Sequence, residues 1–152
     1  MTNAYAASLD VCKRHASRLV WAMAKLRPRF PLSADALRAL DDTELAVLDQ
    51  FSTRFSKLQD AMGAKLFPAV LELAKEQGEL AAFLDKLYRL EKIGAIPSAE
   101  NWLLLREMRN QFSYDYPDDP ELQSAILNKA CKLAGDLISA LNGIESFAAK
   151  YL

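Results

Sequence analysis

Apolar residues recur every three or four positions along almost the whole chain, and this is the spacing of one face of an α-helix. The clearest runs lie at residues 9–26 and 45–73. No segment alternates apolar and polar residues as a half-buried strand would, and no Asn-Gly hairpin signal is present. The pattern therefore predicts an all-α protein.

The first predicted helices are bounded by clear cap and stop signals. Residues 9–26 form the first long run, with Ser8 as its N-cap. Pro28 and Pro31 end it, because proline removes a backbone donor and clashes with the preceding turn. Ser33 is predicted to cap a short helix that follows.

The next long helix is expected to start with Thr43 as its N-cap and to run to about residue 77, with Gly78 closing it. Pro68 lies inside this run. Because proline cannot donate the hydrogen bond to residue 64, we expect a kink or a split nearby, which Gly63 would ease.

Three further helices complete the pattern. One covers residues 80–93 and stops at Gly94. Another starts after Ser98 and runs to about Ser113. The last starts at Asp119, which is followed by proline and an acidic residue, and reaches the C-terminus. The inward side of the helix at 80–93 is predicted to carry Leu80, Phe83, Leu84, Leu87 and Leu90.

Together these segments predict an up-down bundle of about five helices in one domain spanning residues 1–152. The length fits one domain, and 51% hydrophobic with 26% charged residues is typical of a folded globule rather than a disordered chain. The formal net charge of −1 excludes a generally basic nucleic-acid-binding chain. No secretory signal and no membrane-length apolar run is seen, so we expect a cytoplasmic protein with no membrane partner.

The chain has a single histidine, His15, and two cysteines, Cys12 and Cys131. One imidazole excludes sites built on two or three histidines, and Glu-x-x-His does not occur. The cysteines lie far apart and outside any Cys-x-x-Cys motif, so we expect reduced core residues. Phosphate-binding glycine motifs are also absent. The sequence predicts no metal site and no cofactor.

One face of the helix after Ser98 differs from a core stripe, because it carries guanidinium and aromatic groups at helical spacing. Arginine forks suit phosphate oxygens, and aromatic rings suit base stacking. The alternative is a solvated face in which Glu107 and Asp115 form ion pairs. The face consists of Trp102, Arg106, Arg109, Ser113 and Tyr116.

Residues 102–119, WLLLREMRNQFSYDYPDD, resemble the signature region of the HepT-like branch of the HEPN superfamily, whose motif is R-x4-H-x-Y. Arg109 and Asn110 match its start and Tyr116 matches its end. Residues 54–67 and 87–102 are also similar to this branch, and the resemblance covers residues 44 to 135.

The resemblance implies a HEPN-like helical bundle that forms a homodimer with an Arg-lined groove between protomers. In this family, Arg and His from two protomers form a metal-independent ribonuclease site that transfers the RNA 2′-OH onto the adjacent phosphate. Here Arg109 supplies the cation, but Tyr114 replaces the histidine, and a phenol with a pKa near 10 is a poor base at pH 7. The first hypothesis is therefore binding of a nucleotide or RNA through Arg109, Asn110, Tyr114 and Tyr116, with Arg106 and Trp102 beside them.

The family also pairs with minimal nucleotidyltransferases in toxin–antitoxin systems, and the motif Tyr is the residue implied to be adenylylated. Tyr116 is therefore the modification candidate. Two alternatives remain open: an active ribonuclease toxin using Arg109, and a non-catalytic helical module in which Trp102 and the arginines form a protein interface.

Overall fold

The computed structural model describes residues 2–76, 82–112 and 119–152, and in these residues it contains helices and no strand. The prediction of an all-α bundle is confirmed. Its elements are α1 (Thr2–Leu26), a 3-10 turn (Arg27–Arg29), α2 (Ala34–Arg38), α3 (Asp42–Ala61), a π-helical turn (Met62–Leu66), α4 (Phe67–Leu73), α5 (Phe83–Lys92), α6 (Ala99–Gln111) and α7 (Pro120–Ala149).

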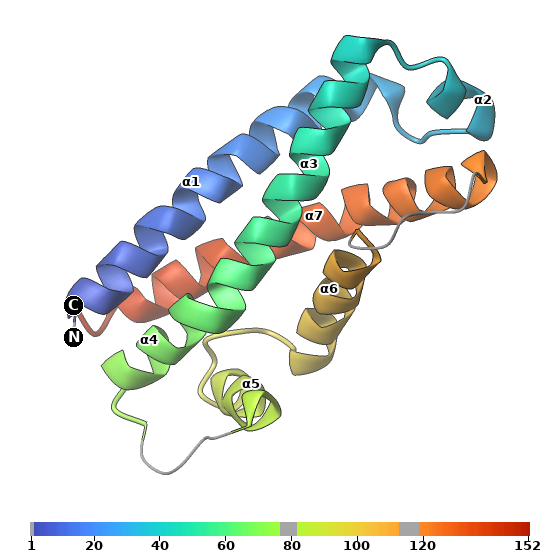
Figure 1. Cartoon of the computed structure of the whole chain (residues 1–152). Coiled ribbons are helices and arrows are strands. Elements are labelled where there is room, and N and C mark those ends of the chain that lie inside the picture. Colours follow the sequence, from blue (N-terminus) through green and yellow to red (C-terminus); the bar gives the residue numbers. More distant parts are fainter. Residues whose placement is uncertain (1, 77–81, 113–118) are drawn as a thin grey trace.

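The long helices α1, α3 and α7 form the frame, with α1 and α3 side by side (Figure 1). The helix α6 lies beside the lower half of α3, and α5 packs against α4 and α6. Two contacts fix α7 antiparallel to α1. Near its end, Glu145 pairs with Lys13 at 3.0 Å. Near its start, the Asn128 amide accepts from the Leu32 N–H at 2.7 Å and donates to the Leu32 carbonyl at 2.8 Å. The buried side chains form one hydrophobic core.

Aromatic side chains in this core set the position of α6 against α3. The Phe112 ring, at the end of α6, meets Phe55 and Phe51 edge-on, at centroid distances of 5.4 and 6.4 Å. Near the start of α6, the Trp102 ring packs on the Phe67 ring of α4, with 4.5 Å between the centroids. Such pairs contribute packing and orientation together. They hold the end of α6 against the middle of α3 and the start of α6 against α4, and the candidate site lies between these contacts.

The cap predictions at Ser33, Ser98 and Asp119 are confirmed, since each side chain accepts a backbone N–H of its helix. The prediction of Thr43 as the cap of α3 is wrong. The Asp41 carboxylate accepts from the Glu44 N–H at 2.8 Å, and the Glu44 carboxylate accepts from the Asp41 N–H at 3.2 Å. This reciprocal capping box satisfies two backbone donors at once, which a cap at Thr43 would not.

Two further expectations in this frame are wrong. The helix α1 begins at Thr2 rather than after Ser8, because Tyr5 packs into the core with 2% of its surface exposed and extends the helix by its own burial. Leu84 does not face inward: it is 47% exposed, and Leu87 and Leu90 supply the buried side of α5. Leu80 and Gly78 lie outside the described residues.

The predicted break at Pro68 is confirmed and takes the form of a π-helical turn. The Phe67 N–H donates to the Met62 carbonyl, five residues back, and α4 starts at Phe67 with Pro68 in its first turn. This wider turn precedes the position where Pro68 has no N–H to donate. The helix then ends at Leu73, earlier than the predicted residue 77.

The helix α6 ends at Gln111, and Ser113 lies outside the described residues. Gly94 ends α5 as predicted, with φ of +86°, a conformation that glycine adopts readily. In the described part of the chain, no helix combines the length and apolar character needed to cross a membrane.

Candidate functional site

An ion pair between α6 and α3 is the centre of the candidate site. The guanidinium of Arg109 donates from Nε to Oδ1 of Asp60 and from Nη2 to Oδ2, both at 2.8 Å. This two-point contact fixes the plane of the guanidinium as well as its position. The hydrogen bond to Asp60 raises the pKa of Arg109, so the group stays charged at any physiological pH.

Arg106 lies one turn earlier on α6 and borders a pocket next to this ion pair. Its guanidinium stands over the Phe83 ring of α5, 5.1 Å from the centroid. The pocket has a volume of about 290 Å³ and is lined by Gln59, Asp60, Gly63, Ala64, Phe83 and Arg106. Asp60 therefore belongs both to the pocket wall and to the ion pair, and it links the two predicted arginines to one place.

Gly63 lines this pocket beside the Phe83 ring. A Cβ at this position would lie 3.6 Å from ring carbons of both Phe83 and Trp102, which is ordinary contact distance. The Gln59 side chain is 4% exposed and supplies an amide at the same wall.

The other predicted residues fall into three groups. Asn110 is exposed at the end of α6. Trp102 is 2% exposed and packs under the pocket, and its indole Nε1 is buried with no hydrogen-bond partner among the described residues. Tyr114 and Tyr116 lie outside the residues that the structure describes. The structure thus places Arg106 at the pocket and Arg109 on Asp60 of the pocket wall, and it buries the Trp102 ring in the core.

Asp60, Gln59 and Phe83 are the site residues that sequence reasoning missed. Asp60 lies within residues 54–67, one of the stretches that resemble the family. Helical periodicity does not relate it to Arg109, which is 49 residues away in the sequence. A charged residue near the end of a long apolar run was the available signal. Finding its partner required the packing of α6 on α3.

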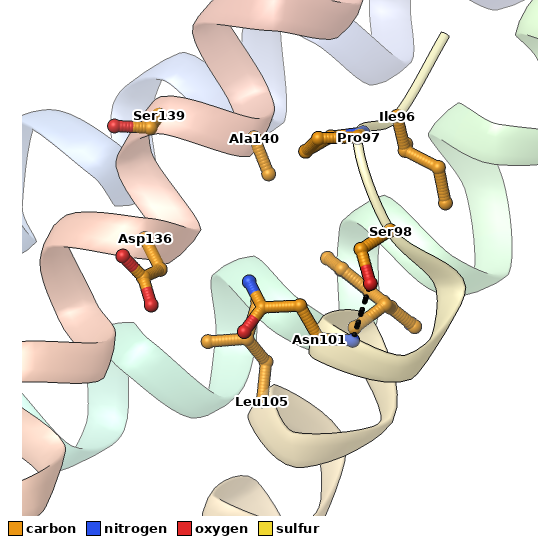
Figure 2. Close-up of a pocket in the computed structure, with 9 residues that line it drawn as sticks. Ile96, Pro97, Ser98, Asn101, Leu105, Asp136, Ser139 and Ala140 are labelled. Atoms are coloured by element: carbon orange, nitrogen blue, oxygen red, sulfur yellow. Dashed lines mark hydrogen bonds between the residues drawn. The ribbon is translucent and has the colours of Figure 1, made fainter. Parts of the chain in front are cut away.

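A second, smaller pocket of about 140 Å³ lies between α6 and α7 (Figure 2). Asn101 of α6 and Asp136 of α7 stand on its two sides, and the Ser98 hydroxyl is engaged as the cap of α6. This pocket contains neither of the two arginines. No group of three or more potential metal ligands occurs within the described ranges.

The two cysteines have no reactive environment. Burial raises the pKa of the Cys12 thiol to about 12, and it also raises the pKa of Cys131. Because the thiolate is the nucleophile and the metal ligand, both side chains stay protonated and unreactive at neutral pH. Both are free, as expected for reduced cysteines.

Comparison of the chain with protein-family models, with curated proteins and with solved structures gives no significant match.

Proposed function

We propose that this protein is a HEPN/HepT-like component of a toxin–antitoxin or nucleotidyltransferase-partner system, and that it binds a nucleotide or RNA through an Arg/Tyr groove at a homodimer interface. The observation that carries the proposal is that Arg106 borders a pocket whose wall includes Asp60, and that Asp60 holds Arg109 in a fixed plane beside it. The resemblance of residues 102–119 to the R-x4-H-x-Y region supplies the family.

The arrangement suits a phosphodiester. Arginine presents several donors in a plane that matches two phosphate oxygens, and a guanidinium held in place before binding loses less entropy when the ligand arrives. Arg106 is the more exposed of the two cations and borders the open pocket beside the Phe83 ring. It makes the first contact, and Arg109 adds an oriented charge behind it.

Homodimerisation doubles this charge. Exposed apolar side chains on the two short helices, Leu84 and Tyr88 of α5 and Leu104 of α6, offer area for a second copy to cover. A cyclic dimer repeats each contact, so both copies of the arginine pair would line one groove.

Binding and mass in solution test the proposal together. We expect light scattering to give a dimer, and a fluorescent single-stranded RNA to bind with an affinity that Arg106→Ala and Arg109→Ala each lower at least tenfold. Arg38→Ala is the matched control, because Arg38 is exposed on α2 and its ion pair in the described part of the chain is with Asp35, three residues away. A protein that stays monomeric, or variants that bind RNA like the wild type, would overturn the proposal.

A cleavage assay separates binding from catalysis. We expect no RNA cleavage by the wild-type protein, because the general base of the family motif is replaced by Tyr114. Cleavage that appears in Tyr114→His and is lost again in Tyr114→His with Arg109→Ala would place the chain in the family as a weakened member. Cleavage by the wild type would instead favour the active ribonuclease.

The partner enzyme is tested by modification. The protein is incubated with ATP and a minimal nucleotidyltransferase, taken from the neighbouring gene if that gene encodes one, and the peptide containing Tyr116 is measured by mass spectrometry. We expect the added mass of one adenylyl group at Tyr116 and none in Tyr116→Phe. An unmodified peptide, under conditions in which the enzyme is active, would remove this part of the proposal.

A further inference from the structure

A second cationic site lies between α1 and α3, away from the arginines of α6. Its centre is the only histidine of the chain, His15, whose Nδ1 is 3.0 Å from Nη1 of Arg54. A guanidinium can only donate, so Nδ1 accepts and the neutral ring carries its proton on Nε2. That N–H is left as a donor on a ring held in place by Arg54.

His15 and Arg54 border a pocket of about 540 Å³, which is within the usual range for small-molecule sites. Val11, Arg14, His15 and Arg18 lie at i, i+3, i+4 and i+7 and therefore share one face of α1. The lining contains three guanidinium groups, an imidazole and a hydroxyl, and none of its described residues is acidic. It consists of Val11, Arg14, His15, Ser17, Arg18 and Arg54.

The positive charge of this pocket is little compensated. Arg14 pairs with Asp10 at 3.5 Å, but both side chains are largely exposed, and such a pair contributes little. Arg18 and Arg54 have no ion pair with any described residue, and Nε of Arg54 is buried with no hydrogen-bond partner among them. A buried N–H group rarely lacks a hydrogen-bond partner in a folded protein. On a chain with a net charge of −1, three arginines therefore lie together with one exposed ion pair among the described residues.

We propose that this α1–α3 pocket binds a phosphate group, either as free phosphate or as part of a nucleotide. Guanidinium forks and the Nε2–H of a neutral imidazole match tetrahedral phosphate oxygens, and an anion would offset the repulsion among the cations. Trp21 lies outside the pocket lining, three residues after Arg18 on α1, and is 48% exposed, with Lys25 Nζ 5.9 Å from the centroid of its ring. The exposed part of this ring is a surface on which a base can stack. This proposal does not depend on the proposed function, because the two sites share no residue.

The single histidine makes the test direct, since its imidazole gives one set of proton NMR signals. Inorganic phosphate and ATP are titrated separately into the full chain at pH 7. We expect both to shift the His15 signals, and binding of phosphate to raise the pH midpoint of the His15 titration. Arg18→Ala, at an exposed position, should weaken binding at least tenfold. Arg38→Ala, whose side chain pairs with Asp35 on α2, should give the same His15 shifts as the wild type.

The outcomes are distinct. Tighter binding of ATP that is lost in Trp21→Ala identifies a nucleotide site, and equal binding of ATP and phosphate identifies a phosphate site. Unchanged His15 signals with both ligands at millimolar concentration overturn the proposal, and so does an Arg18→Ala protein, folded by circular dichroism, that binds like the wild type. RNA binding lost in Arg109→Ala with normal His15 shifts separates this site from the α6 site.

Discussion

The ion pair between Arg109 and Asp60 positions the guanidinium and contributes little to the stability of the fold. The Asp60 side chain is 49% exposed and that of Arg109 is 28% exposed, so water screens much of their attraction. Exposed ion pairs contribute little, even with two-point geometry. The contact matters because a fixed guanidinium plane is a prepared phosphate contact.

A double-mutant cycle measures this pair. We expect Asp60→Asn to lower the free energy of unfolding by about 1 kcal/mol or less, and the coupling between Asp60→Asn and Arg109→Gln to be about 0.5–1 kcal/mol. Urea unfolding of the four proteins gives both values. The cycle is needed because Arg109 makes other contacts. A coupling of several kcal/mol would show instead that the pair is a structural element of the core.

His15 should make stability depend on pH. Burial first, and then the charges of Arg54 and Lys57 on α3 and Arg14 on α1, lower its pKa in the folded protein. The neutral ring is therefore favoured by folding. Its contribution is present above the unfolded pKa of about 6.5 and is lost as the pH falls through the folded value.

We therefore expect the free energy of unfolding to fall between pH 7 and pH 5 more steeply in the wild type than in His15→Gln, which cannot gain a proton. Urea unfolding at several pH values in phosphate-free buffer checks this. Parallel curves for the two proteins would show that protonation of His15 does not oppose folding.

At the scale of the element, the start of α3 distinguishes two candidate N-cap residues, Asp41 and Thr43. Asp41, Asp42 and Thr43 are all good cap residues, and the pattern alone favoured Thr43. The reciprocal bonds between Asp41 and Glu44 identify the true cap. We expect Asp41→Ala to lower the free energy of unfolding by about 1 kcal/mol and Thr43→Ala, at an exposed first-turn position, to change it little. Thermal unfolding of both variants decides, and equal losses would contradict the assignment.

What the sequence could predict follows from how local each feature is. Helices α1, α3 and α7 carry long apolar stripes, and the caps at Ser98 and Asp119 sit beside the residues they cap, so both were found. The apolar spacing predicted that Leu84 faces inward, but the short helix α5 buries only Leu87 and Leu90 and leaves Leu84 exposed. The partnership of Asp60 with Arg109 depends on how α6 crosses α3, which no local pattern contains.

At the scale of the molecule, two small cationic regions stand on a chain whose charges nearly cancel. Long-range attraction for nucleic acid is therefore weak, and affinity must come from contacts at these regions. The proposed groove would hold Arg106 and Arg109 from each of two protomers. This sets an upper limit on how many phosphate charges the dimer can neutralise.

The salt dependence of RNA binding measures that number. With four arginines on single-stranded RNA, the slope of log affinity against log salt concentration should be about −3 at its steepest. Because Arg109 is already paired with Asp60, Arg106 should supply at least half of this slope. Arg106→Ala should therefore reduce the slope to about −1.5 or to a value closer to zero. Anisotropy titrations between about 50 and 200 mM KCl give the slopes, with Arg38→Ala as the control. A slope near −6, or a slope that Arg106→Ala leaves unchanged, would mean that RNA binds to another surface of the protein. The arginines of the α1–α3 pocket would then be the next residues to substitute.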